Sequence, residues 1–138
     1  MSFVTFGINY RCDILLCMKE ELAPPIGPYS HAVKAAGLLF VSGQIPVDPQ
    51  TGKVVEGGIE AQTQQVIDNI EAVLRSEGLT LENVVKTEVY LKNMDDFKTM
   101  NMVYAERFSQ AKKPARQAMQ VGKLPLDVLV EISCIAAF

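Results

Sequence analysis

Apolar residues recur at helical spacing in the middle of this chain. Between residues 60 and 77 they are three and four positions apart, which is typical of a helix with one buried face and one polar face. Gly78 follows at the position where helices commonly end in the left-handed conformation. Before this helix, residues 47–58 are rich in glycine and proline, which indicates a turn or hairpin region.

Other segments have the alternation or the β-branched composition of strands. In residues 84–91 we expect Val85, Val89 and Leu91 to share one buried face with Thr87, while Lys86, Glu88 and Tyr90 lie on the opposite face. The remaining predicted strands are residues 38–42, 113–121 and 128–138.

A second helix is predicted after residue 94, with Asp95 or Asp96 as its N-cap. Phe97, Tyr104 and Phe108 form the apolar stripe of this helix, and the same stripe contains one amide side chain, Asn101. Because a buried amide needs hydrogen-bond partners, Asn101 either fixes the helix against the sheet or belongs to a site.

The resulting order, β, β, α, β, α, β, β, predicts an α+β fold in which both helices cover one face of a mixed sheet. Two helices leave the other face open, and we expect this sheet to be apolar on both faces. It would then pack against copies of itself in a closed oligomer.

Length and composition narrow the class of protein. At 138 residues with 49% hydrophobic content, the chain is long enough for one domain and too short for two ordinary ones. A net charge of −3 provides no cationic field for nucleic acid. Cys12, Cys17 and Cys134 have neither zinc-ligand spacing nor a disulfide pattern, and no apolar run is long enough to span a membrane.

The N-terminal residues form a separate segment by composition. Residues 1–17 are treated as an extension and residues 18–138 as the domain, although residues 14–16 could be a first strand and Met18 an alternative start. The extension has one basic and one acidic residue, which makes it a poor secretory or organelle signal. A cytoplasmic location is therefore expected, with organelle targeting left open.

Two charged residues stand among apolar neighbours in predicted strands. Arg116 could receive the carboxylate of a small organic acid, since a guanidinium matches a carboxylate at two points, or it could form a structural ion pair. Glu131 either faces water in a cleft, pairs with a cation or acts as an acid or base, because burying an unpaired carboxylate is costly. If the last two strands pair, Arg116 is the expected neighbour of Glu131.

Several segments, in order along the chain, carry a resemblance to a known family: Gly27-Pro28-Tyr29-Ser30, residues 41–48, residues 84–87, Pro114-Ala115-Arg116 and Val130-Glu131-Ile132. Over residues 23–136 the chain closely resembles the reactive intermediate deaminase A (RidA) family. The resemblance implies a chorismate-mutase-like fold, a homotrimer whose sheets pack into a central barrel, and sites at the subunit interfaces. It also implies hydrolysis of 2-imino acids, in exchange with 2-enamino acids, to 2-oxo acids and ammonia without cofactor or metal.

The resemblance also implies roles for particular residues. Arg116 would bind the substrate carboxylate and Glu131 would position or deprotonate water. The other matching pocket positions are Tyr29, Ser42, Gly43, Asn101 and Ala118. Tyr29 and Ser42 can donate hydrogen bonds, and Gly43 permits close backbone approach. On its own, Tyr29 could equally be a packed aromatic residue.

The chain departs from the family pattern near two of these positions. Gln117 stands where many members have Ser or Thr, and Ala118 stands where members have Cys, Thr or Ala, so this chain offers no side-chain hydroxyl or thiol at either position. His31 replaces a common glutamine, and we expect it at the surface rather than as a neighbour that tunes Tyr29. A carboxylate-binding module without catalysis is the alternative function. RNA cleavage is disfavoured by the acidic charge and the single histidine.

Overall fold

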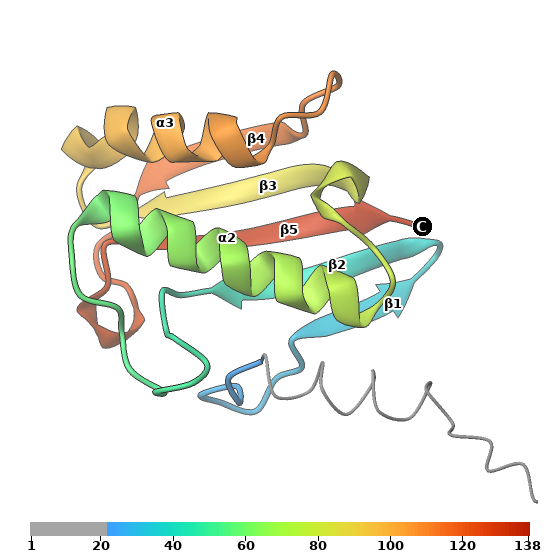
Figure 1. Cartoon of the computed structure of the whole chain (residues 1–138), viewed down its shortest axis with the longest axis horizontal. Helices are drawn as coiled ribbons and strands as arrows, with labels where there is room; N and C mark the ends of the chain where they lie inside the picture. Colours follow the sequence, from blue (N-terminus) through green and yellow to red (C-terminus); the bar gives the residue numbers. More distant parts are fainter. Residues whose placement is uncertain (1–21) are drawn as a thin grey trace, which may run out of the picture.

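The computed structural model describes residues 22–138, and the predicted extension and strand at residues 14–16 lie outside this range. The elements are β1 (Ala32–Ala35), β2 (Leu38–Gln44), α2 (Ile59–Ser76), β3 (Val84–Leu91), α3 (Phe97–Arg107), β4 (Ala115–Gln120) and β5 (Val130–Ala137). From β2 onward they follow in the predicted order, whereas β1 was not predicted. Figure 1 shows both helices on the same face of one sheet, with α3 on the β4 side. The predicted α+β arrangement is confirmed.

Within the described residues the five strands form one mixed sheet in the order β1-β2-β5-β3-β4. β5 pairs antiparallel with both β2 and β3, whereas β3 and β4 are parallel and are joined through α3. The last two strands therefore do not pair, because β3 lies between them. The expectation that Glu131 and Arg116 are neighbours through such pairing is wrong.

The core lies between the helices and the sheet. α2 buries the stripe that its spacing predicted, including Val66, Ile67, Ile70 and Leu74. The helix ends as expected at Gly78, whose φ is 77°. Backbone hydrogen bonds satisfy carbonyls at the helix end: the Gly78 amide donates to Arg75, and the amides of Glu77 and Leu79 both donate to Leu74.

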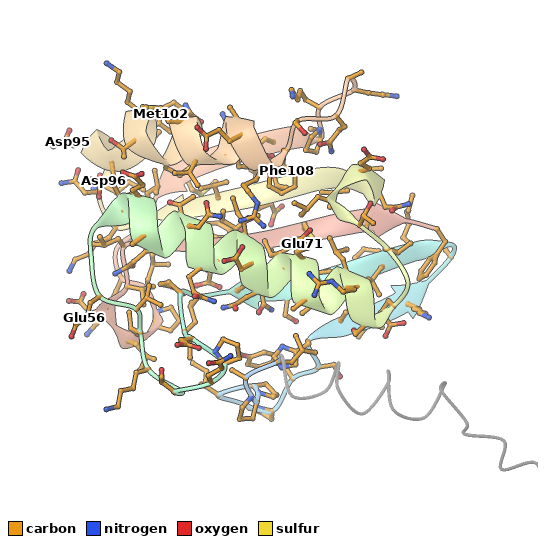
Figure 2. The ribbon with its side chains drawn as sticks, viewed as in Figure 1. Glu56, Glu71, Asp95, Asp96, Met102 and Phe108 are labelled. Atoms are coloured by element: carbon orange, nitrogen blue, oxygen red, sulfur yellow. The ribbon has the colours of Figure 1, made fainter. Side chains whose placement is uncertain are left out.

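Two local predictions on β3 and α3 need correction. Val85 is exposed, and Val84 is buried instead, because the pairing register with β5 shifts between Val84 and Lys86. Such a bulge moves a side chain to the other face of the sheet. Asp96 occupies the N-cap position of α3, which is one of the two predicted positions, but its side chain makes no capping hydrogen bond. The short helical turn before it, residues 94–96, is capped by Asn93, whose Oδ1 accepts a hydrogen bond from the Asp95 amide. Figure 2 shows Asp95 and Asp96 at this end and Phe108 at the other.

The face of the sheet away from the helices is mixed in character rather than apolar throughout. Its exposed apolar side chains include Val33, Phe40, Val85 and Met119. Between them lies a polar cluster centred on Glu88, which accepts hydrogen bonds from Lys86, Tyr90, Gln117 and Ser133. We call this surface the open face. Over the described residues, none of the helices combines the length and the hydropathy that a membrane span requires.

Candidate functional site

Glu131 lies at the edge of a hollow of about 330 Å³. The hollow is built by the loop before β1, the end of β2, and the turn before β5, and its lining residues are Ile26, Tyr29, Ser42, Gly43, Ile45, Pro125 and Glu131. These segments are far apart in sequence but meet because β2 and β5 are hydrogen-bonded neighbours. Most of the positions that the family resemblance marked on this side of the molecule therefore do come together. The hollow is mainly apolar, with a carboxylate and two hydroxyl groups at its wall.

The Glu131 carboxylate is half-buried and has no ion pair or hydrogen bond to another described residue. Burial raises the pKa of this carboxyl group above its ordinary value of 4.5, because the charged form loses hydration. A carboxylate with a raised pKa is a stronger base than a fully hydrated one. Of the three interpretations left open by the sequence, pairing with a cation within the chain is thus excluded for the described residues.

Gly43 allows the close approach of this carboxylate. A Cβ atom placed on Gly43 would collide with Glu131 Oε1, and would lie 2.9 Å from its Cδ and 3.2 Å from its Cγ. Backbone φ at Gly43 is outside the left-handed region, so space rather than conformation requires glycine here. The prediction that Gly43 permits a close approach is supported, with Glu131 as the group that approaches.

Tyr29 is carried by a loop that is tied to β2 by several hydrogen bonds. Ser42 Oγ donates to the Ser30 carbonyl at 2.7 Å, and the Ser42 amide donates to the His31 carbonyl at 2.9 Å. The hydroxyl proton of Ser42 is therefore engaged, so this group faces the hollow as an acceptor rather than as the predicted donor. The Tyr29 side chain is 44% exposed and borders the hollow.

His31 is partly buried, which corrects the expectation that it lies at the surface. Its Nε2 is 2.7 Å from the Ala23 carbonyl, and its Nδ1 is buried without a hydrogen-bond partner in the part of the chain that is described. Because the Ala23 carbonyl can only accept, Nε2 is the donor in this hydrogen bond. His31 therefore ties the segment before Tyr29 to the sheet.

Arg116 lies in a second hollow, of about 430 Å³, beside α3. Its Nη1 donates to Asn101 Oδ1 at 2.7 Å, and its guanidinium carbon lies 4.7 Å from the centroid of the Tyr104 ring. The side chain is exposed, and no carboxylate of residues 22–138 forms an ion pair with it. A structural ion pair is thus excluded within this range, and Asn101 belongs to the surroundings of Arg116. Ala118, two residues further along β4, packs against the core.

Within a single chain, the hollow of Arg116 and the hollow of Glu131 are separate. Arg116 is the cross-strand partner of Thr87, whose side chain is fully buried on the helix-covered face, whereas Glu131 is the partner of Tyr90 on the open face. β3 separates the two strands, so the backbones are about 10 Å apart across the sheet. The sequence did not reveal this separation.

Sequence reasoning also gave no site role to Thr87 or Tyr104, which contact each other beneath Arg116 at 2.8 Å. The sequence did contain one indication of this contact, because Thr87 is a polar residue on the otherwise apolar buried face of its strand. Its hydroxyl needs a partner at that depth, and Tyr104 on the predicted stripe of α3 is the residue that supplies one.

Several known proteins are similar to this chain in sequence and in fold. The family model described as "Endoribonuclease L-PSP" matches residues 20–138. A RutC family protein of Pyrococcus horikoshii is 55% identical over 117 residues, which cover 85% of this chain and 92% of the relative. The 2-iminobutanoate/2-iminopropanoate deaminase of Salmonella typhimurium is 41% identical, with 85% and 92% covered. The crystal structure of E. coli TdcF with bound serine superposes with a TM-score of 0.82 at 36% identity, covering 86% of this chain and 94% of TdcF.

Proposed function

The chain belongs to the RidA family, whose model is described as endoribonuclease L-PSP, and on that premise we propose that it is a hydrolytic deaminase of 2-imino acids. The observation that carries the proposal is the unpaired, half-buried carboxylate of Glu131 at a mainly apolar hollow. A cavity-lining carboxylate with a raised pKa is suited to general-base catalysis. Arg116, with no ion-pair partner among residues 22–138, supplies the charge that a carboxylate substrate requires.

We further propose that the site is completed between subunits of a homotrimer. Arg116 and Glu131 lie on opposite faces of the sheet in one chain, so a small substrate held by Arg116 would meet Glu131 of a neighbouring copy. The exposed apolar residues of the open face, such as Phe40 and Met119, favour such packing. The barrel arrangement rests on the family resemblance together with this surface.

The reaction is the addition of water to a C=N bond followed by loss of ammonia. Arg116 binds the substrate carboxylate and so fixes the adjacent imine carbon. The imine nitrogen enters the reaction protonated. Glu131 takes a proton from water while the water oxygen bonds to the imine carbon and the electron pair of the C=N π bond moves to the nitrogen, which gives a neutral carbinolamine. Glu131 then returns this proton to the amine nitrogen, and the carbon–nitrogen bond breaks as the hydroxyl loses its proton to the Glu131 carboxylate. The products are the 2-oxo acid and ammonia, which takes up the remaining proton. These steps use only side chains of the protein and water.

The other polar groups assist at defined atoms. Tyr29 has an exposed phenol at the wall of the hollow, which can donate to the substrate or to the attacking water. Ser42 can accept from that water, since its own proton is held by Ser30. The apolar remainder of the wall, formed by Ile26, Ile45 and Pro125, raises the strength of electrostatic contacts once substrate excludes solvent.

Binding without catalysis and RNA cleavage are the two other candidates. Because TdcF has been crystallised with bound serine, a relative of this chain holds a small amino acid, which suits a carboxylate receptor in either a deaminase or a binding module. The name of the family model includes an endoribonuclease, but the chain has a net charge of −3 and one histidine. This charge balance does not favour association with a phosphate backbone, and a single histidine does not supply the paired general acid and base that such cleavage uses.

The first test follows the decay of 2-iminobutanoate that an amino acid oxidase generates in solution. We expect the wild type to accelerate decay, and Arg116→Ala and Glu131→Gln to lose this activity while remaining folded oligomers. If the wild type binds 2-oxobutanoate through Arg116 but does not accelerate decay, the binding module is the correct function. Cleavage of RNA that survives both substitutions would favour the nuclease.

Subunit mixing tests the shared site. Arg116→Ala and Glu131→Gln are unfolded together in equal amounts and refolded, with each variant refolded alone as the control. If every site takes Arg116 from one subunit and Glu131 from the next, random assembly restores both groups at about one quarter of the sites. Recovery near a quarter of wild-type activity supports the arrangement. No recovery from a mixture shown to contain mixed oligomers contradicts it.

A further inference from the structure

Thr87 and Arg116 lie side by side beneath α3. They are partners in the parallel pairing of β3 and β4, and residues opposite each other in a sheet project to the same face. Thr87 is completely buried, whereas Arg116 is exposed. The pair therefore spans the distance from the core to the surface at the edge of the sheet.

Tyr104 connects these two residues. Its hydroxyl is 2.8 Å from Thr87 Oγ1, and the face of its ring lies 4.7 Å from the guanidinium carbon of Arg116. The ring is also stacked on Phe108, with centroids 4.4 Å apart, and Phe108 is fully buried. The phenol is thus held at its tip by a hydrogen bond and on one face by an aromatic ring, which leaves the ring little freedom to turn.

Asn101 completes the arrangement from the preceding turn of α3, where its Oδ1 accepts from Arg116 Nη1. The guanidinium is therefore contacted by the amide of Asn101 and the ring face of Tyr104, three positions apart on α3, and its carbon also lies 5.6 Å from the centroid of the Phe97 ring on the same helix. An exposed arginine otherwise samples many rotamers, and ordering it on binding costs side-chain entropy. With one Nη1 hydrogen engaged by Asn101, the second Nη1 hydrogen and those on Nε and Nη2 are left to receive a carboxylate.

We propose that Thr87 and Tyr104 are positioning residues for Arg116: the Thr87 hydroxyl fixes the Tyr104 ring, and the ring fixes the plane in which the guanidinium binds the substrate carboxylate. This inference rests on the proposed role of Arg116 as the carboxylate receptor. Thr87 is fully buried and does not line the hollow of Arg116, whereas Tyr104 lines this hollow and is argued to act through the guanidinium. They order the Arg116 side chain before the substrate binds, so that less conformational entropy is lost on binding the carboxylate.

A role in core packing alone makes a different prediction. Thr87→Val removes the hydroxyl with little change of shape, and Tyr104→Phe keeps the ring that packs on Phe108. If the contact serves stability only, these variants melt at lower temperature but bind substrate as before. If it positions Arg116, they raise KM for 2-iminobutanoate about fivefold with kcat nearly unchanged, since a carboxylate contact made equally in the ground and transition states acts on KM.

The experiment measures binding of 2-oxobutanoate by calorimetry and the kinetics of 2-iminobutanoate decay for Thr87→Val, Tyr104→Phe and the double variant. Thr63→Val is the matched control, because Thr63 is equally buried but lies on α2 away from Arg116. We expect the double variant to weaken binding no more than either single one, since both break the same chain of contacts.

Repeating Thr87→Val in the Arg116→Ala background separates this inference from the proposed function. Positioning through Arg116 predicts that Thr87→Val changes neither residual binding nor residual activity once the arginine is gone. Unchanged KM and affinity in folded Thr87→Val and Tyr104→Phe overturn the inference while the deaminase proposal stands. A wild type that binds 2-oxobutanoate no better than Arg116→Ala overturns the proposed role of Arg116 and the inference with it.

Discussion

Gly43→Ala should displace the Glu131 carboxylate while leaving the rest of the protein in place. The new Cβ would lie 2.9 Å from Glu131 Cδ, whereas ordinary contact begins at 3.4 Å, so the Cδ must retreat by at least about 0.5 Å. The Oε1 atom lies closer still and must move further. Since a misplacement of about 1 Å can cost about 100-fold in rate, we expect kcat to fall roughly 10- to 100-fold.

The substitution should act on catalysis rather than on folding or binding. Backbone φ at Gly43 suits alanine, and loss of glycine freedom in the unfolded chain favours the folded state by about 0.4–1 kcal/mol. KM should change little, because Arg116 lies in the other hollow of the chain. The assay is the oxidase-coupled decay of 2-iminobutanoate, with the melting temperature and oligomeric state measured on the same samples.

Gly122→Ala is the matched control, because a Cβ at Gly122 meets no atom within 4 Å and its φ is not in the left-handed region. It should keep wild-type kcat. Combining Gly43→Ala with Glu131→Gln tests the cause: if the alanine acts by displacing this carboxylate, the double variant is no slower than Glu131→Gln alone. Wild-type kcat in Gly43→Ala, with Glu131 still required for activity, would refute the reasoning.

Three further predictions concern stability, measured at one protein concentration. Phe108→Ala should lower the free energy of unfolding by about 3–5 kcal/mol, whereas Met102→Ala, at a side chain 63% exposed, should stay within about 0.5 kcal/mol; equal effects in denaturant titrations would contradict the core assignment. Thr63→Val should raise the free energy of unfolding by about 1 kcal/mol, because Thr63 Oγ1 is buried without a hydrogen-bond partner in the described structure. A lower melting temperature of this variant would instead indicate a water bound to the hydroxyl. Glu131→Gln should stabilise at neutral pH: burial raises the folded-state pKa, so ionisation costs stability as pH rises from about 4.5 through that pKa. The gain should vanish below about pH 4, and a gain that persists there would refute this cause.

Elements with a strong local pattern could be predicted from the sequence. The stripe of α2 and its end at Gly78 follow from spacing and from the conformational freedom of glycine. The alternation of β5 correctly placed Glu131 opposite Val130 and Ile132. By contrast, β1 was not identified, because its sequence AVKA has little β-branched content and its turn at Ala36 and Gly37 lacks the usual asparagine.

Strand neighbours could not be predicted from local pattern. Both crossovers through a helix give parallel strands, but β3 and β4 are adjacent while β5 fills the gap between β2 and β3. The periodicity of the sequence does not indicate which of the two crossovers places its strands side by side and which leaves room for a third strand between them. The assumed contact between Arg116 and Glu131 failed for this reason, although each residue was correctly singled out as unusual. The bulge that exposes Val85 is likewise a property of the pairing with β5.

Two glutamates on the open face show why environment decides which carboxylate is available for chemistry. Glu88 accepts hydrogen bonds from Lys86 and Tyr90, and the Lys86 contact is the main reason that its pKa is lowered. Glu131, the cross-strand partner of Tyr90, has no such partner among the described residues, and burial raises its pKa. The first carboxylate is a satisfied charge with little tendency to take a proton. The second is held against the Gly43 backbone at a mainly apolar hollow, and of the two it is the one that can accept a proton from water without first breaking an existing contact.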